Sequence, residues 1–182
     1  NGTRTIIPAA QLAPWVECAP GVRLRVFLQG AFNSEFQLMD DDLRVAGLLP
    51  LTEPYTGLGF NTIGNTATVV DPARLSISGK NAVVDWVLVE LRNKNNPAQI
   101  MATTCALVER DGDVVGVDGF SKLLFNVLSD QYHVAIRHRN HLGAMSSIPV
   151  VVGTGTVVYD LTRADTPVFG DQSTAVLPSG LR

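Results

Sequence analysis

Apolar and polar residues alternate along most of this chain, the pattern of β-strands whose successive side chains point to opposite faces of a sheet. In Val22–Gln29 every second residue is apolar, with Arg23 and Arg25 at positions between them. Val83–Leu91 is largely apolar on both faces, with Val83, Asp85, Val87, Val89 and Leu91 on one and Val84, Trp86, Leu88 and Glu90 on the other. We therefore expect this strand to be covered on both sides, as at the centre of a sandwich.

Further strands are predicted at short intervals: Ile100–Arg110, Asp113–Val117, Leu123–Val127, Gln131–Arg139, Ile148–Val152 and Thr156–Leu161. The dipeptides Asp111-Gly112 and Asp118-Gly119 and the run Gly153–Gly155 separate several of them. Asp-Gly is a strong signal for a tight hairpin turn. Short strands punctuated in this way predict an antiparallel β-sandwich, an all-β fold.

One part of the chain departs from this pattern. Apolar residues in Phe36–Leu49 are close to helical spacing, which predicts a short helix around Asp40–Ala46. Pro50–Gly64 is a long loop rich in Pro, Gly, Thr and aromatic residues, and loops of this length are packed, functional or mobile. We therefore expect three parts. Residues 1–21 form an N-terminal extension or edge segment, residues 22–161 form one β-sandwich domain with a short helix or long loop insertion, and residues 162–182 form a C-terminal tail or linker.

The composition favours a protein partner over a nucleic acid or a membrane. Apolar residues make up 46% and charged residues 17% of the chain, so apolar surface should remain for other proteins once a core is filled. The formal net charge of −3 gives no general attraction for a phosphate backbone, so we expect no nucleic-acid binding. No uninterrupted apolar run reaches the ~18 residues of a membrane-spanning helix, so no membrane insertion is expected.

All three histidines lie in one stretch, Tyr132–Gly143, together with two arginines. The candidate ligand-binding residues there are Arg137, His138, Arg139 and His141. The arginines work against a bound metal dication, and no Gly-x-Ser-x-Gly or comparable nucleophile motif is present, so we expect no catalytic residue. Two interpretations stay open: a strand end whose arginines pair with Asp85 and Glu90, or a site for an anion or a sugar.

Calcium is the one cofactor for which the acidic residues offer candidates, and the candidates are weak: Asp40, Asp42, Asp111, Asp113 and Asp118. The run Asp40–Asp42 lacks the spacing of an EF-hand and suits a helix start. Asp111-Gly112-Asp113 and Asp118-Gly119 lack the complete calcium-loop motif, and hairpin turns explain them. We therefore expect no cofactor, with a surface calcium ion as the open alternative.

The cysteines and the chain ends add two further expectations. Cys18 and Cys105 form either one disulfide or two buried free thiols, and secretion would favour the disulfide. Apolar segments near both ends, Ile6–Val16 and Ala175–Leu181, have no obvious place in the core. They are candidates for an assembly interface through Ile6, Ile7, Leu12, Trp15, Val16, Val176 and Leu177.

Four segments together resemble one uncharacterised module of large secreted and cell-surface proteins of Bacteroidota. They read VRLRVFLQGAFN (22–33), LMDDDLRVAGLLPLTEPYTGLGF (38–60), NAVVDWVLVELRNKNNPAQIMATTCALVERDGDVVGVDG (81–119) and YHVAIRHRNHLGAMSSIPV (132–150). Such modules are adhesin-like and associated with type IX secretion, so the resemblance implies an extracellular or cell-surface location. Residues 111–143 are also loosely similar to transthyretin-like and Cna-B-like sandwiches, which resemble the immunoglobulin type.

We therefore expect a non-enzymatic structural or adhesive β-sandwich module that associates with itself, with other subunits or with neighbouring modules, as a filament or large oligomer. Strand-edge pairing is the expected geometry of that contact. The alternative is a carbohydrate-binding module, with or without calcium, for which Trp15, Tyr55, Phe60 and Tyr159 in or near loops offer aromatic rings.

Overall fold

The computed structural model describes residues 19–64, 68–120, 122–155, 157–170, 174, 180 and 181. Its strands are β1 (Gly21–Arg25), β2 (Phe32–Asn33), β3 (Leu38–Met39), β4 (Val83–Asn93), β5 (Asn96–Glu109), β6 (Asp113–Val115), β7 (Leu123–Leu124), β8 (Asp130–Arg137), β9 (Ala144–Met145), β10 (Val150–Val152) and β11 (Val158–Asp160). Its helices are α2 (Asp42–Val45), α3 (Pro72–Leu75) and the 3-10 helix η2 (Gly79–Asn81). The prediction of an all-β fold with a short helical insertion is confirmed.

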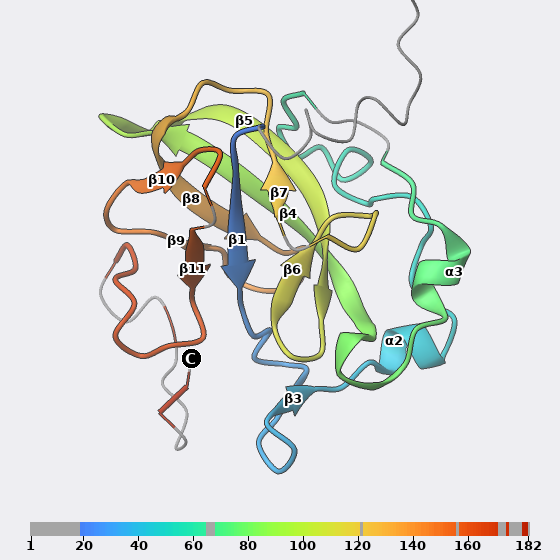
Figure 1. Cartoon of the computed structure of the whole chain (residues 1–182). Helices are drawn as coiled ribbons and strands as arrows, with labels where there is room; N and C mark the ends of the chain where they lie inside the picture. Colours follow the sequence, from blue (N-terminus) through green and yellow to red (C-terminus); the bar gives the residue numbers. More distant parts are fainter. Residues whose placement is uncertain are drawn as a thin grey trace, which may run out of the picture.

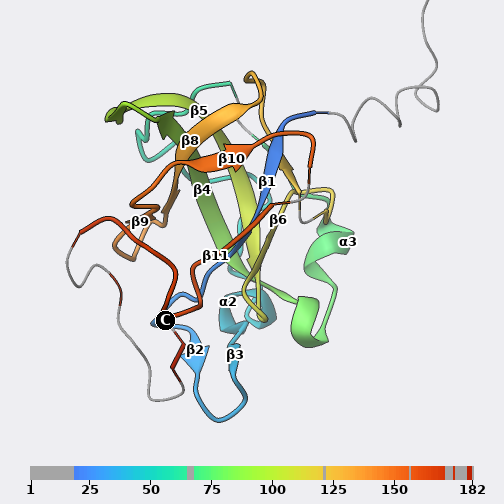
Figure 2. The same ribbon diagram turned by 60° about the vertical axis from the view of Figure 1, so that its left-hand side comes forward.

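Nine strands form one sheet in the order β10-β8-β4-β5-β6-β1-β11, with β7 on β1 and β9 on β8. The pairs are antiparallel, except that β11 runs parallel to β1. The sheet curls so that β1, which neighbours the terminal strand β11, comes beside β10 at the other end, where Gly21 and Gly153 form an antiparallel bridge (Figure 2). Strand β1 then lies in front of β4 and β5 (Figure 1), which produces the two layers of a sandwich-like fold.

The main core fills the space between these layers. Val87, Val89 and Leu91 of β4 belong to the same buried cluster as Val22 and Leu24 of β1. Alternate residues of each strand share a face, so the period-2 pattern of the sequence is what places these side chains together.

A second core lies on the opposite face of β4 and β5. Trp86 and Leu88 point there and pack with Tyr55 from the insertion, which comprises residues 40–82 between β3 and β4. The indole Nε1 of Trp86 donates a hydrogen bond to the carbonyl oxygen of Pro50 at 2.9 Å. The long loop predicted at Pro50–Gly64 is thus packed against the sheet, and β4 is covered on both sides as expected.

The predicted assignment of faces in β4 holds from Trp86 to Leu91 but is wrong at the start of the strand. Val84 lies in the main core and Val83 in the second core, the reverse of strict alternation. The register with β5 shifts between Val83 and Asp85, which marks a β-bulge. One extra residue in a strand reverses the direction of every side chain that precedes it.

The helices are short. Helix α2 lies within the predicted Asp40–Ala46, whereas α3 was not predicted from the sequence. Asp71 caps α3 by accepting the N–H of Ala73 at 2.8 Å, and Pro72 suits the first helical position. Across the described ranges, no helix has the length and apolar character needed to traverse a bilayer.

Candidate functional site

The histidine-rich stretch that follows β8 forms a chain of hydrogen bonds around a buried carboxylate. Asp85 of β4 is 3% exposed, and its Oδ2 lies 3.1 Å from His138 Nε2 and 2.9 Å from Arg139 Nη2. Nδ1 of His138 lies 2.9 Å from Nδ1 of His141, and His141 Nε2 accepts the N–H of Gly30 at 3.2 Å. This series of hydrogen bonds therefore links β4 to the connection between β1 and β2.

These contacts assign a role to each ring nitrogen. His138 Nδ1 also accepts the N–H of Asn140 at 3.1 Å, so its ring hydrogen is on Nε2 and points at Asp85. His141 must then carry its hydrogen on Nδ1, which leaves the Nε2 lone pair for Gly30. Both imidazoles are neutral, and all four ring nitrogens are used inside the protein rather than offered to a metal or a substrate.

The two arginines of this stretch have different partners. Arg139 pairs with the buried carboxylate as predicted. The expectation that both arginines pair with Asp85 and Glu90 is wrong for Arg137, because Glu90 is bound by Arg92 at 2.5 Å. The guanidinium of Arg137 instead lies 5.7 Å from the ring centroid of Phe60. Three of the four predicted ligand-binding residues therefore converge, and the fourth faces an aromatic ring.

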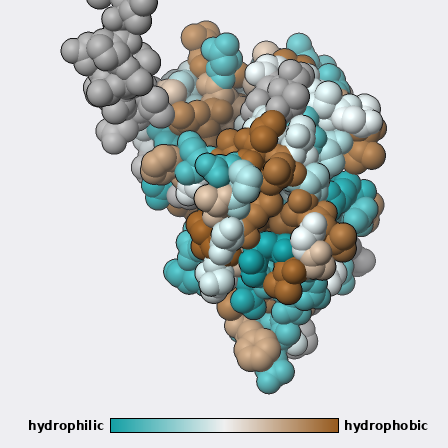
Figure 3. Space-filling view, turned by 90° about the vertical axis from the view of Figure 1, so that its right-hand side faces the viewer, coloured by the Kyte–Doolittle hydropathy of each residue, from teal (hydrophilic) through white to brown (hydrophobic). Residues whose placement is uncertain are grey.

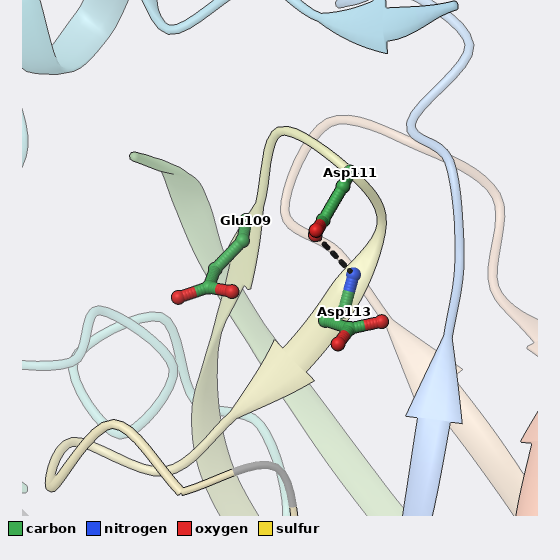
Figure 4. A group of neighbouring side chains, drawn as sticks. All are labelled: Glu109, Asp111 and Asp113. Atoms are coloured by element: carbon green, nitrogen blue, oxygen red, sulfur yellow. Dashed lines mark hydrogen bonds between the residues drawn. The ribbon is translucent and has the colours of Figure 1, made fainter. Parts of the chain in front are cut away.

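A cluster of carboxylates lies at the turn from β5 to β6. Glu109 ends β5, Asp111 lies in the turn and Asp113 begins β6, and their oxygens lie within 4.8 Å of one another (Figure 4). Asp111 Oδ1 accepts the N–H of Asp113 at 3.2 Å, and Gly112 between them has a φ of +92°, which glycine adopts without strain. The predicted Asp-Gly turn is confirmed, and it brings two of the five calcium candidates together.

Basic side chains neutralise this cluster, and each carboxylate has one: Arg74 for Glu109, Arg25 for Asp113 at 2.8 Å and Lys80 for Asp111 at 3.9 Å. Burial raises the pKa of Glu109, with Arg74 opposing that rise. Burial and the neighbouring Asp111 also raise the pKa of Asp113. A calcium ion here would have to displace three cations, so the residues fit an internally paired cluster better than a metal site.

The other three calcium candidates lie apart from this cluster. Asp40 accepts a hydrogen bond from Asn33 Nδ2 at 3.3 Å, and Asp42 is exposed at the start of α2. Asp118 accepts the N–H of Phe120 at 3.0 Å within a turn. These are the contacts of turns and of a helix start, as the sequence had indicated for the local structure.

An open pocket of about 370 Å³ borders the carboxylate cluster. Basic, acidic and apolar side chains line it: Arg23, Arg25, Lys80, Asp111, Asp113, Leu24 and Val158. Three cationic and two anionic groups leave it with little net charge. The pocket therefore presents hydrogen-bond donors and acceptors side by side without strongly attracting either a simple anion or a simple cation.

Exposed apolar side chains concentrate on the insertion. Seven of the sixteen large apolar side chains that are exposed in the described part of the chain belong to it: Val45, Leu48, Leu51, Leu58, Ile63, Val69 and Ile77. We term these seven residues the apolar face. Figure 3 shows apolar side chains gathered on the side of the molecule that carries α2 and α3. Large exposed apolar patches mark contact sites for other molecules.

Cys105 is buried in the second core with no disulfide partner among the described residues, and its Sγ lies 3.4 Å from Glu53 Oε2. Burial raises the pKa of the Cys105 thiol, and the Glu53 carboxylate raises it further, so the unreactive thiol form is favoured. Cys18 lies outside the described residues, and the disulfide therefore stays a prediction.

Other predicted residues fall outside the described ranges or are buried. The assembly candidates lie outside them, namely Ile6, Ile7, Leu12, Trp15, Val16, Val176 and Leu177. Tyr55 is fully buried and Tyr159 is 9% exposed, while Phe60 packs edge-on against Tyr55 with ring centroids 5.2 Å apart. Tyr55 and Tyr159 are therefore too buried to serve in an exposed sugar platform, and that expectation is wrong for these two rings, whereas Phe60 is half-buried.

The chain matches no protein-family model, no curated protein and no solved structure. Sequence reasoning missed Glu109, although Glu109, Asp111 and Asp113 alternate around a predicted hairpin turn and this spacing was a usable signal. It also missed Gly30 and Arg74, for which the sequence holds no comparable signal. Gly30 takes part through its backbone N–H, which every residue type except proline has, and Arg74 lies in the insertion, far from Glu109 in the sequence.

Proposed function

We propose that this chain is a non-enzymatic structural or adhesive module of an extracellular or cell-surface protein, and that it associates through the apolar face with copies of itself or with neighbouring modules. The observation that supports this is the exposure of large apolar side chains on the insertion, with Leu51 43% and Val69 58% exposed. Full burial of one such side chain contributes about 1.5–3 kcal/mol. A contact that covers several of them would therefore be stable.

Contact between side chains is better supported than the strand-edge pairing expected from the sequence. The outermost strands of the sheet, β10 and β11, have three residues each and so offer few unpaired backbone groups. The histidine stretch and the carboxylate cluster bond within the chain, which suits a structural role. Extracellular location follows from the resemblance of the sequence and belongs to the same proposal.

We expect the wild-type chain to self-associate with increasing concentration and the double variant Leu51→Asp/Val69→Asp to associate roughly 100-fold more weakly, because about 3 kcal/mol of apolar burial is lost. Sedimentation velocity over a concentration series measures the change. Negative-stain electron microscopy shows whether the assemblies are filaments.

The matched control is Val151→Asp/Val158→Asp, which changes two valines of similar exposure, 50% and 52%, in β10 and β11. It should associate like the wild-type chain, and circular dichroism checks that both variants fold. Equal weakening in both double variants would contradict a contact that is specific to the apolar face. A wild-type chain that stays monomeric up to about 1 mM would contradict the self-association part of the proposal.

Carbohydrate binding is a second candidate function, which the pocket beside the carboxylate cluster favours. A neutral sugar both donates and accepts hydrogen bonds, as do the arginine and aspartate side chains that line this pocket together. A near-neutral lining would not discriminate against such an uncharged ligand, and a volume of about 370 Å³ lies within the range of small-ligand sites. The site differs from the aromatic platform expected from the sequence.

Titration calorimetry with a panel of neutral mono- and disaccharides tests this candidate. We expect at least one sugar to bind, the Arg23→Ala variant to lose that binding by about tenfold or more, and a chelator to have no effect because basic side chains occupy the place of calcium. Lys94→Ala, remote from the pocket, is the control and should bind normally. An absence of binding for every sugar, or equal binding by Arg23→Ala, would reject the pocket as a sugar site.

A further inference from the structure

One imidazole joins two connections that are far apart in the sequence. The N–H of Gly30 donates to His141 Nε2 across a separation of 111 positions, which ties the β1–β2 connection to the β8–β9 connection. His141 is in turn held by His138, and His138 by Asp85. We term this series of contacts, from Asp85 through both imidazoles to Gly30, the histidine latch.

The histidine latch requires both imidazoles to be neutral. A proton added to His141 Nε2 would place one N–H against another, because that nitrogen accepts the Gly30 N–H at 3.2 Å. A proton added to His138 Nδ1 would likewise face the N–H of Asn140 and the Nδ1–H of His141. In either case at least one hydrogen bond of the latch becomes a repulsive contact between two donors.

We infer that the histidine latch is a pH-sensitive device, which holds the β8–β9 connection on the β1–β2 connection in neutral solution and releases it in mildly acidic solution. The released segment carries Leu142, which is 95% exposed. The end of that segment is fixed by the antiparallel pairing of Ala144 in β9 with Ile136 in β8. Release therefore lets the backbone that carries Leu142 move while the chain stays anchored at β9.

Charged and titratable groups from several elements surround the latch. Asp85 of β4 favours a protonated imidazole, but Arg139 already pairs with it at 2.9 Å. Arg137 adds a second cation at the end of β8. Burial raises the pKa of Tyr55, whose neutral hydroxyl donates to the carbonyl oxygens of Trp86 and Arg137. The β1–β2 connection contributes the backbone N–H of Gly30. Together these charges give little stabilisation to a proton added to either imidazole of the latch.

Burial lowers the pKa of His141 below its ordinary value of 6.5, and repulsion from His138 in its charged form lowers it further, while Asp85 opposes both. At pH values between that lowered pKa and 6.5, His141 binds fewer protons in the closed latch than in the released segment. The closed latch is therefore fully favoured above pH 6.5, and this preference is lost as the pH falls below 6.5.

Nuclear magnetic resonance of the whole chain between pH 7.5 and pH 5.5 tests the inference. At pH 7.5 the ¹⁵N shifts of His141 should identify the neutral form with its hydrogen on Nδ1. Amide exchange of Gly30, corrected for the intrinsic exchange rate, should show protection that falls up to about tenfold one pH unit below 6.5. The control amide is that of Gly119, which donates to the carbonyl oxygen of Gly116 at 2.9 Å in another turn and should keep its protection.

Two variants separate the latch from general loosening of the fold. His141→Asn retains a polar side chain that does not titrate, so the pH response of Gly30 should disappear. His133→Asn changes a buried histidine of β8 that bonds to the carbonyl oxygen of Ser146, and the response should remain. The inference is overturned if Gly30 and Gly119 respond equally to pH, or if the response survives in His141→Asn. Should a variant fail to fold, the comparison of the two amides in the wild-type chain still decides.

Discussion

Arg74→Met is expected to lower the free energy of unfolding at pH 7 by about 3–5 kcal/mol. Arg74 is the cation that meets Glu109, and their side chains are only 10% and 3% exposed. Methionine retains the aliphatic packing of arginine, so the substitution mainly removes the charge. The carboxylate is then left buried, with Asn81 Nδ2 at 3.4 Å as a remaining neighbour. Urea denaturation followed by fluorescence measures the loss.

The loss in Arg74→Met should depend on pH. Burial already raises the pKa of Glu109, and removal of Arg74 takes away the opposing effect, so the folded variant binds a proton more readily than the unfolded chain. Folding is then favoured as the pH falls, and the deficit should be largest at neutral pH and shrink towards about pH 5. The double variant Arg74→Met/Glu109→Gln should recover most of the lost stability, because it leaves no unpaired charge.

The matched control is Arg163→Met, which breaks an ion pair between side chains that are 62% and 69% exposed. Solvent screens such a pair, so its loss should leave the denaturation midpoint almost unchanged. If Arg74→Met costs no more than this control, the buried pair does not stabilise the join between α3 and β5.

Asp85→Ala is expected to cost about 2–4 kcal/mol, somewhat less than a fully buried pair because the Arg139 side chain is 20% exposed. The substitution removes the acceptor for the Nε2–H of His138 and for the Arg139 guanidinium, and it leaves both donors unpaired near the second core. Urea denaturation at pH 7.5 measures the loss while the imidazoles are neutral.

Asp42→Ala serves as the control for Asp85→Ala, since Asp42 is exposed at the start of α2. Only a small change is expected there, from the weak interaction of an acidic side chain with the helix N-terminus. Equal losses in the two variants would mean that the buried carboxylate does not organise the segment after β8.

Local patterns predicted the strands better than the short elements. The alternation in β4 is long enough to identify both of its buried faces, and Asp111-Gly112 identified the β5–β6 hairpin. Helix α3 and the hairpin of β2 and β3 have two to four residues per element, which is too short for a periodic pattern to emerge. The bulge at Val83–Asp85 was also missed, because an extra residue in one strand depends on the register with its partner.

The contacts of the candidate sites could likewise be predicted from the sequence only in part. Charge complementarity predicted that Arg137 and Arg139 pair with Asp85 and Glu90. Arg139 does pair with Asp85, 54 positions away, whereas Arg137 lies against the ring of Phe60. A cationic side chain can meet any of several carboxylates or an aromatic ring, and the choice depends on the directions that neighbouring strands impose. Sequence complementarity therefore limits the set of partners without selecting among them.

The amino-acid sequence by itself determined the all-β class, the two-sided burial of β4 and the turn at Asp111-Gly112, because these follow from the period of the side chains and from the backbone freedom of glycine. Only the tertiary structure decided the curl that brings β1 to β10, the parallel pairing of β1 with β11, the cations around Glu109 and the contact of His141 with Gly30. Each of these joins groups that are distant in the chain, and a backbone N–H or a strand edge looks the same at every position until the fold selects its partner.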